Sequence, residues 1–391
     1  LAMGDIINFK GIGPEYVGTA SGLVATIQLI GAVVLPSYVL IPIASGNFNT
    51  LFILAVACIA SLNGCGSKFN GQDTVVEVGD EKVTADVANF FARYQQAQFE
   101  TTYSSYLGDD FWEKEVTDGK TYEENYKDSI MDSLEEMYIL DEHKDDYKVS
   151  LSDDEEKSIE DAAKKFTDSN DSAAKDAVSG DEKTVKKVLE LLTLQKKMET
   201  AMTVDVDTNV SDEEAAQKKM QYVLFSTKTT GSDGKSTDMS DDEKAEVKKK
   251  AEDFQKDAAS AEDFSVFATA VGASATDLTF DSDTTSPNED LIKAADKLKE
   301  GEVTDVIEAD NGYYVAKVVS LLDRDATDTK KESIVSQRKS DQYQSICKKW
   351  KKKTDIKVHK KIWNTISFAD QGVTVKSTTE DTDTSSDSSS K

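Results

Sequence analysis

The feature that most constrains this chain is a long uncharged segment in front of a highly charged one. No Asp, Glu, Lys or Arg occurs between positions 16 and 67. Residues 16–44 are apolar and long enough to span a bilayer. The next apolar stretch, LFILAVACIASL, is short for a span and typical of the apolar region of a signal peptide. The sequence therefore predicts an apolar membrane-helix fragment over 1–50 and a signal-peptide-like region over 51–64.

The charged part of the chain is strongly acidic. The whole sequence has 74 acidic and 46 basic residues, a formal net charge of −28, and nearly all of them follow the apolar segment. A surface of this sign repels the phosphates of nucleic acid, so no nucleic-acid partner is expected. The two histidines, His143 and His359, are far apart in sequence, which argues against a histidine metal site or a Ser-His-Asp arrangement. We expect no metal and no cofactor.

Apolar periodicity divides the rest of the chain. Tyr122, Tyr126, Ile130 and Leu134 recur at helical spacing, as in much of the region around them, and predict a mainly helical body. The tail after residue 368 is polar and acidic and is expected to be disordered. The expected divisions are a tether over 65–73, a helical N-terminal domain over 74–215, a compact domain over 216–322, a C-terminal helix and strand over 323–368, and the tail over 369–391.

The compact domain has a distinctive order of elements. A strand, YVLFST, is followed by two helices, a short strand, ATDLTF, and a third helix, NEDLIKAADKL. Two further strands are joined by a turn at Asn311-Gly312. The predicted fold class is therefore α+β: a mainly helical domain into which a small mixed sheet with flanking helices is inserted.

Taken in order, pieces of this domain resemble a parvulin-type peptidyl-prolyl isomerase. They are YVLFST, AEDFSVFATA and DLIKAADKLKEGEVTDVIEADNGYYVAKVV. VVEVGDEKVT with the helices after it resembles the N-terminal domain of PrsA- and SurA-type foldases. KKWKKKTDIKVHKKIW resembles the segment with which PrsA-type foldases return to that first domain. The resemblance implies a foldase whose partners are unfolded or partly folded secreted proteins, and whose helical domain over 74–215 is a chaperone domain.

The N-terminal segments carry two further resemblances. LNGCGSK resembles the lipobox of a bacterial lipoprotein, which implies cleavage before Cys65 and lipidation of its thiol. Residues 11–57 resemble the last two membrane helices of a major-facilitator transporter. A lipid anchor and a retained membrane helix both place residues 66–391 at the outer face of the bacterial cytoplasmic membrane. A role as part of a membrane transporter is a third and weaker hypothesis, supported by 11–57 alone.

The resemblance also implies where a catalytic site would lie. Parvulins have a histidine in the first strand and another in the last, and these positions fall on Tyr222 and Tyr314. The acid nearest the middle catalytic position is Asp277. Phe280 and Leu291, with Tyr314, are the candidates for an apolar peptide-binding pocket.

The two tyrosines leave the chemistry open. Rotation about an X–Pro bond needs no covalent step, and an enzyme need only favour the twisted amide by desolvation and hydrogen bonding. A tyrosine pair could retain some isomerase activity, or its rings could simply pack in the sheet core. A chaperone that holds unfolded chains needs neither histidine. The alternative from another class is a non-catalytic surface lipoprotein that binds one dedicated partner.

Overall fold

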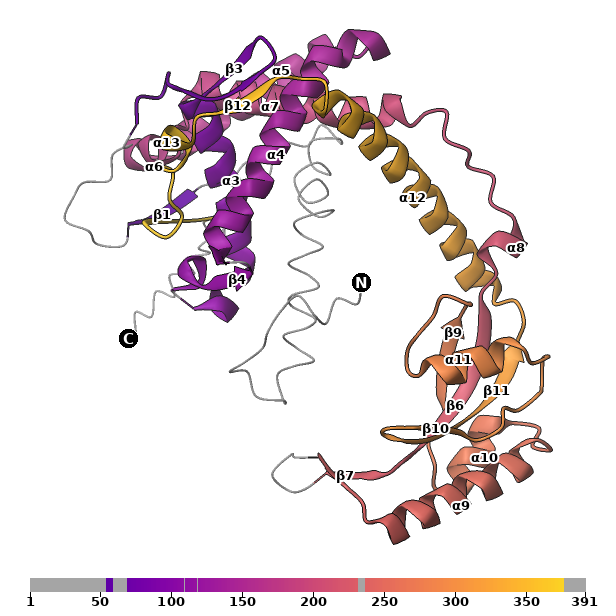
Figure 1. Cartoon of the computed structure of the whole chain (residues 1–391). Coiled ribbons are helices and arrows are strands. Elements are labelled where there is room, and N and C mark those ends of the chain that lie inside the picture. The colour runs from indigo at the N-terminus through magenta and orange to yellow at the C-terminus, as the bar shows by residue number, and fades with distance from the viewer. Residues whose placement is uncertain (1–53, 59–68, 109, 118, 231–235, 376–391) are drawn as a thin grey trace, which may run out of the picture. The chain divides into compact units, whose positions relative to one another are not determined.

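The computed structural model describes residues 54–58, 69–108, 110–117, 119–230 and 236–375, which form two compact units (Figure 1). Unit 1 contains the described residues up to Val204 and those from Gln342 onward, and unit 2 is Asp205–Asp341. The α+β fold class is confirmed. Cys65 and most of the expected apolar segments lie outside the described residues. None of the helices in the described ranges has the length and hydropathy needed to cross a bilayer.

Unit 1 is built on four long helices, α3 (Ala85–Leu107), α4 (Tyr122–His143), α5 (Asp153–Ser169) and α7 (Glu182–Met202), with the short α6 (Ser172–Val178). Local sequence explains where they begin. The Thr121 and Ser152 hydroxyls accept hydrogen bonds from the backbone of Glu124 and Glu155, whose carboxylates accept in return. Between α3 and α5 lie η5 (Phe111–Glu113), β4 (Glu115–Thr117), β5 (Lys120–Thr121) and η6 (Lys144–Tyr147).

The C-terminal segment packs against these helices. β12 (Ile356–Val358) pairs with β2 (Thr74–Val78), which pairs in turn with β3 (Glu81–Thr84). After α13 (Lys360–Trp363), the chain forms β13 (Gln371–Val375) beside α3. Residues 371–375, which we assigned to the tail, are therefore ordered, because their backbone is bound by α3 and by β1 (Leu54–Cys58).

Unit 2 contains a four-stranded sheet in the order β10–β11–β6–β9. β6 (Lys218–Ser226) and β11 (Gly312–Ser320) lie side by side at its centre (Figure 1). The outer strands are β9 (Thr276–Phe280) and β10 (Ile307–Ala309). All three pairings are antiparallel, so the sheet is not mixed as we expected. The turn at Asn311-Gly312 forces β10 and β11 to be antiparallel, and two successive helices return the chain from β6 to begin β9.

Helices cover the two faces of this sheet unequally. α9 (Asp241–Ala258) and α10 (Phe264–Ala270) lie on one face, and the short α11 (Glu289–Asp296) lies on the other. A capping box formed by Ser240 and Glu243 starts α9. The small β7 (Lys228–Thr230) and β8 (Ser236–Asp238) form a separate hairpin, and α8 (Asp212–Ala215) precedes β6.

α12 (Arg324–Lys351) begins in unit 2 and ends in unit 1. In unit 2, both nitrogens of the Arg324 fork bond the two carboxylate oxygens of Asp212, at 2.7 and 3.0 Å. These hydrogen bonds hold the pKa of Asp212 well below its ordinary value. In unit 1, the Tyr343 hydroxyl donates to Glu136 at 2.7 Å, and Trp350 stacks on His143 at 4.1 Å.

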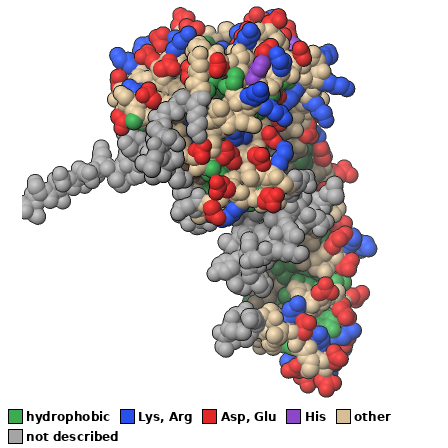
Figure 2. Space-filling model, turned by 60° about the vertical axis from the view of Figure 1, so that its left-hand side comes forward, with side chains coloured by type: hydrophobic (Ala, Val, Ile, Leu, Met, Phe, Trp, Pro, Cys, Tyr) green, Lys and Arg blue, Asp and Glu red, His purple; other side chains and the backbone are tan. Residues whose placement is uncertain are grey.

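Figure 2 shows acidic side chains spread widely over the face in view, among lysine and arginine, as the net charge requires.

Candidate functional site

Tyr222 and Tyr314 lie on neighbouring central strands and face the same side of the sheet. Tyr222 is opposite Ala316 in the register of β6 and β11, and Tyr314 is opposite Leu224. Their ring centroids are 5.9 Å apart at an interplanar angle of 51°. Side chains alternate between the faces of a strand, so residues two apart on facing strands become neighbours. The structure thus brings together the two tyrosines that the sequence singled out.

The two rings differ in exposure. Tyr314 is 2% exposed, and its hydroxyl oxygen accepts a hydrogen bond from Nδ2 of Asn311 at 2.9 Å. Tyr222 is half-buried and packs at the edge of the same apolar cluster. Only Tyr222 is therefore placed to touch a ligand without rearrangement of the core.

Phe280 and Leu291 belong to the same cluster as the tyrosines but lie deeper. Both are 0% exposed, in contact with other apolar side chains of β6, β11 and α11. In this conformation they support the tyrosine pair from below and present no surface to a peptide. The surface of the cluster is made by partly buried residues that sequence reasoning did not select, Leu224, Leu278 and Ile307. Period-2 alternation from Tyr222 and Phe280 was the signal that could have identified Leu224 and Leu278.

Asp277 lies on the other face of the sheet. It is opposite Gln221 in the register of β9 and β6, one residue out of phase with Tyr222. Nε2 of Gln221 donates to its carboxylate at 2.9 Å, and Nζ of Lys219 lies 3.1 Å away. Hydrogen bonds from Gln221 and Lys219 hold the pKa of Asp277 below its ordinary value. The structure does not bring this acid to the tyrosine pair.

The arrangement supports binding more readily than acid–base chemistry. We call the two tyrosines and four apolar residues around them the tyrosine face: Met220, Tyr222, Leu224, Leu278, Phe280 and Tyr314. The tyrosine hydroxyls are its only side-chain hydrogen-bonding groups. Across the described part of the chain, no group of three or more His, Cys, Asp and Glu side chains is arranged to hold a metal ion.

Comparison with known proteins identifies the domain. Residues 234–331 match the family model of the PPIC-type PPIase domain, so this part of the chain is similar to a parvulin-type domain. The match begins after β6 and therefore does not include Tyr222. The expected resemblance to parvulin-type foldases is confirmed for this domain. No curated protein sequence matches the chain.

Several solved structures are similar over most of their own length. The foldase protein PrsA from Streptococcus pneumoniae is 21% identical over 66% of this chain and 98% of that one, with a TM-score of 0.27. PrsA from Lactococcus lactis is 15% identical over 76% and 98%, with a TM-score of 0.29. A SurA-like chaperone of Campylobacter jejuni is 11% identical over 73% and 98%, with a TM-score of 0.26. At these low scores, the assignment rests on the matched domain.

Proposed function

We propose that this protein is an extracytoplasmic folding factor that binds unfolded exported proteins and carries a degenerate isomerase domain. The observation that supports it best is the tyrosine face: a parvulin-type sheet whose expected histidine positions are occupied by two packed aromatic rings. In this proposal, Tyr222 and the partly buried apolar residues around it touch the peptide. Residues 74–215 and 323–368 form the helical chaperone domain, and 216–322 the inserted domain.

The chemistry of this face argues for weak catalysis. The barrier to rotation about an X–Pro bond is about 20 kcal/mol. Lowering it requires hydrogen-bonding groups placed where they bind the twisted amide better than the planar one. Here the Tyr314 oxygen is buried and already accepts from Asn311, and Asp277 is on the opposite face. Apolar contact and the Tyr222 hydroxyl are what remain for a peptide, so this face offers few hydrogen-bonding groups that could favour the twisted amide.

We further propose that the protein is a lipoprotein at the outer face of the cytoplasmic membrane. Its support is the LNGCGSK sequence, in which Cys65 would follow the cleavage site. Mass spectrometry of the mature protein isolated from membranes tests this. The expected result is an N-terminal diacylglyceryl cysteine at Cys65, absent in a Cys65→Ser variant. A peptide that runs through Gly64 and an unmodified Cys65 would overturn it.

Suppression of aggregation tests the chaperone role. The full chain, held in lipid nanodiscs, is mixed at equal concentration with an unrelated protein diluted from denaturant, and light scattering is followed. We expect scattering to fall relative to empty nanodiscs. Protection of a single partner and of no unrelated protein would instead favour a dedicated receptor.

Isomerase activity is tested by NMR exchange on an X–Pro peptide. We expect little or no acceleration by the unmodified chain and a gain in the Tyr222→His/Tyr314→His variant. The matched control is Tyr222→Phe/Tyr314→Phe, which keeps the rings and removes both hydroxyls. Strong acceleration by the unmodified chain, lost in the phenylalanine control, would show that the tyrosines are catalytic and would contradict a degenerate site.

A further inference from the structure

The outer edge of β13 is occupied by a distant segment of the same chain. β1 (Leu54–Cys58, LAVAC) pairs antiparallel with β13, with Val56 opposite Val373 and Ala57 opposite Gly372. These two strands form a sheet of their own. β1 is uncharged and lies within the region 51–64 that the sequence predicts to be part of a signal peptide. An apolar extended segment thus shows what this edge accepts.

Hydrogen bonds to α3 show which backbone groups of β13 point away from β1. The backbone N–H of Val373 donates to Oε2 of Glu100, and that of Val375 donates to Oγ1 of Thr101, both at 2.8 Å. These groups point to α3, away from β1. Because backbone direction alternates along an antiparallel strand, Gly372 and Thr374 turn their N–H and C=O groups toward β1.

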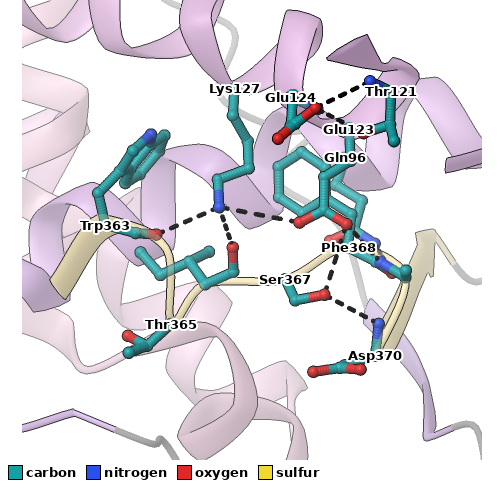
Figure 3. Close-up of polar contacts among 12 residues, drawn as sticks. Gln96, Thr121, Glu123, Glu124, Lys127, Trp363, Thr365, Ser367, Phe368 and Asp370 are labelled. Atoms are coloured by element: carbon teal, nitrogen blue, oxygen red, sulfur yellow. Dashed lines mark hydrogen bonds and ion pairs between the residues drawn. The ribbon is translucent and has the colours of Figure 1, made fainter. Parts of the chain in front are cut away.

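Four polar side chains of α3 and α4 bind the segment that leads into β13. We call Arg93, Gln96, Glu123 and Lys127 the buried polar cluster. The Lys127 ammonium donates to the carbonyls of Trp363 and Ile366, and the Glu123 carboxylate accepts from the backbone of Ala369 at 3.1 Å (Figure 3). These three hydrogen bonds run from α4 to the backbone of the C-terminal segment, and the Lys127 ammonium also lies 3.8 Å from the Glu123 carboxylate.

The same cluster reaches the first residue of β13. The carbonyl of Gln371 accepts from Nε2 of Gln96 at 2.7 Å and from the Arg93 guanidinium at 3.0 Å. Arg93 is 4% exposed and Lys127 is 7% exposed. Burial lowers the pKa of Arg93 to about 10 and also lowers the pKa of Lys127. Burying two cations costs free energy, and their hydrogen bonds offset that cost. Arg93 holds the first residue of β13 against the helices, and Lys127 holds the segment before it.

We propose that the outer edge of β13 is a strand-acceptor site for an extended, uncharged apolar segment of an exported protein. In the uncleaved chain β1 occupies this edge. The inference rests on the proposed function: cleavage before Cys65 would remove β1 and leave the donors and acceptors of Gly372 and Thr374 unpaired. Strand addition gains its affinity from hydrogen bonds between backbone groups, which every residue except proline can form. Such a site accepts many sequences, as a chaperone requires.

Competition between β1 and an added peptide tests the site in the full chain. The probe is a fluorescent peptide with the sequence of Leu54–Cys58, with serine in place of the cysteine and lysines appended for solubility. Ala57→Pro removes a β1 N–H that bonds β13, and should raise the affinity for the peptide about tenfold. Val56→Pro is the matched control, because the Val56 N–H points away from β13. Equal affinity in the two variants would overturn the proposal.

Backbone methylation of the peptide provides a test that does not depend on how the variants fold. On the Ala57→Pro chain, a peptide N-methylated at the position of Ala55 should bind about tenfold more weakly, since it lacks a ladder hydrogen bond. A peptide N-methylated at the position of Val56 should bind as well as the unmodified one. Equal binding of the two methylated peptides would overturn the site.

The outcomes also separate this site from the proposed function. Suppression of aggregation without any peptide binding would leave the folding factor intact and overturn the strand-acceptor edge. Concentration-dependent pairing of the Ala57→Pro chain, seen by light scattering and without peptide binding, would mean that a second copy is the occupant, and would also overturn the proposal.

Discussion

The tyrosine face of unit 2 and the buried polar cluster of unit 1 use buried side chains in opposite ways. The tyrosine face lies where the family resemblance places catalytic groups, yet apolar packing buries Tyr314 there and leaves Tyr222 half-buried. The buried polar cluster has no expected catalytic role, yet it contains two buried cations. The buried cations Arg93 and Lys127 thus mark the segment that unit 1 holds in place. Tyr314, at an expected catalytic position, has an apolar environment instead.

The largest expected loss of stability comes from a cavity beneath the tyrosine face. Phe280→Ala removes a fully buried ring from beneath the tyrosines and should destabilise unit 2 by about 4 kcal/mol through lost burial and a cavity. The measurement is urea unfolding followed by far-ultraviolet circular dichroism.

Unit 1 provides an internal reference for this measurement. All three tryptophans of the chain, Trp112, Trp350 and Trp363, lie in unit 1. Tryptophan fluorescence should therefore report an unchanged unit 1 in Phe280→Ala. Val266→Ala, at a 66% exposed position of unit 2, is the matched control and should stay within about 0.5 kcal/mol. An equally small effect of Phe280→Ala would show that the tyrosine face is not tightly packed.

The second effect breaks the polar side. Lys127→Met keeps the bulk of the side chain but removes the ammonium that donates to the carbonyls of Ile366 and Trp363; the Trp363 carbonyl keeps only the Ile366 N–H. We expect a loss of about 3 kcal/mol in unit 1, measured by urea unfolding with tryptophan fluorescence. Lys157→Met, which breaks an exposed pair with Asp161, should cost less than about 0.5 kcal/mol. If both variants unfold at the same urea concentration, the buried polar cluster does not hold the C-terminal segment.

A smaller effect sharpens the role of the tyrosine pair. Asn311→Ala and Tyr314→Phe each remove one partner of the bond between Asn311 and the Tyr314 hydroxyl, and each should destabilise unit 2 by about 1 kcal/mol. Circular dichroism of the single and double variants gives the coupling between them. The double variant should be little worse than either single one. Full additivity would mean that the hydroxyl has another partner.

The smallest effect concerns the pH dependence of unit 1. Nε2 of His359 lies 2.7 Å from Oε1 of Glu77, and hydrogen bonds from His359 and then Lys357 hold the pKa of Glu77 below its ordinary value. A carboxyl whose pKa is lowered by folding stabilises the fold above its unfolded pKa, and that contribution is lost as pH falls through the folded value.

His359→Gln tests this linkage. The stability difference between the unmodified chain and the variant should be largest near neutral pH and shrink below about pH 4.5. It is measured as the urea midpoint by tryptophan fluorescence between pH 7 and pH 3. Val204→Ala, at an 83% exposed position of unit 1, is the matched control and should show no such convergence. A constant difference at every pH would contradict the role of this pair.

Particular residues show how far sequence reasoning reached. The order of elements in the compact domain follows from local patterns, because alternation and turn chemistry are properties of short segments. The pairing of Tyr222 with Tyr314 was expected only from the resemblance to parvulins. The position of Asp277 depended on the register of β9 against β6, and a shift of one residue reverses the face of a strand. Whether Phe280 and Leu291 line a surface or a core depended on how α11 packs, which no short segment specifies.

By itself, the sequence determined the helical body, the strands of the inserted domain and its likeness to parvulins, since each depends on residues close together in the chain. Tertiary structure alone decided that Tyr314 is buried and that Asp277 lies on the other face of the sheet. It also decided that Arg93 holds Gln371, 278 positions away, and that Lys127 holds Trp363, 236 positions away. Those outcomes depend on register and on long-range packing, where one buried charge must meet one particular backbone carbonyl.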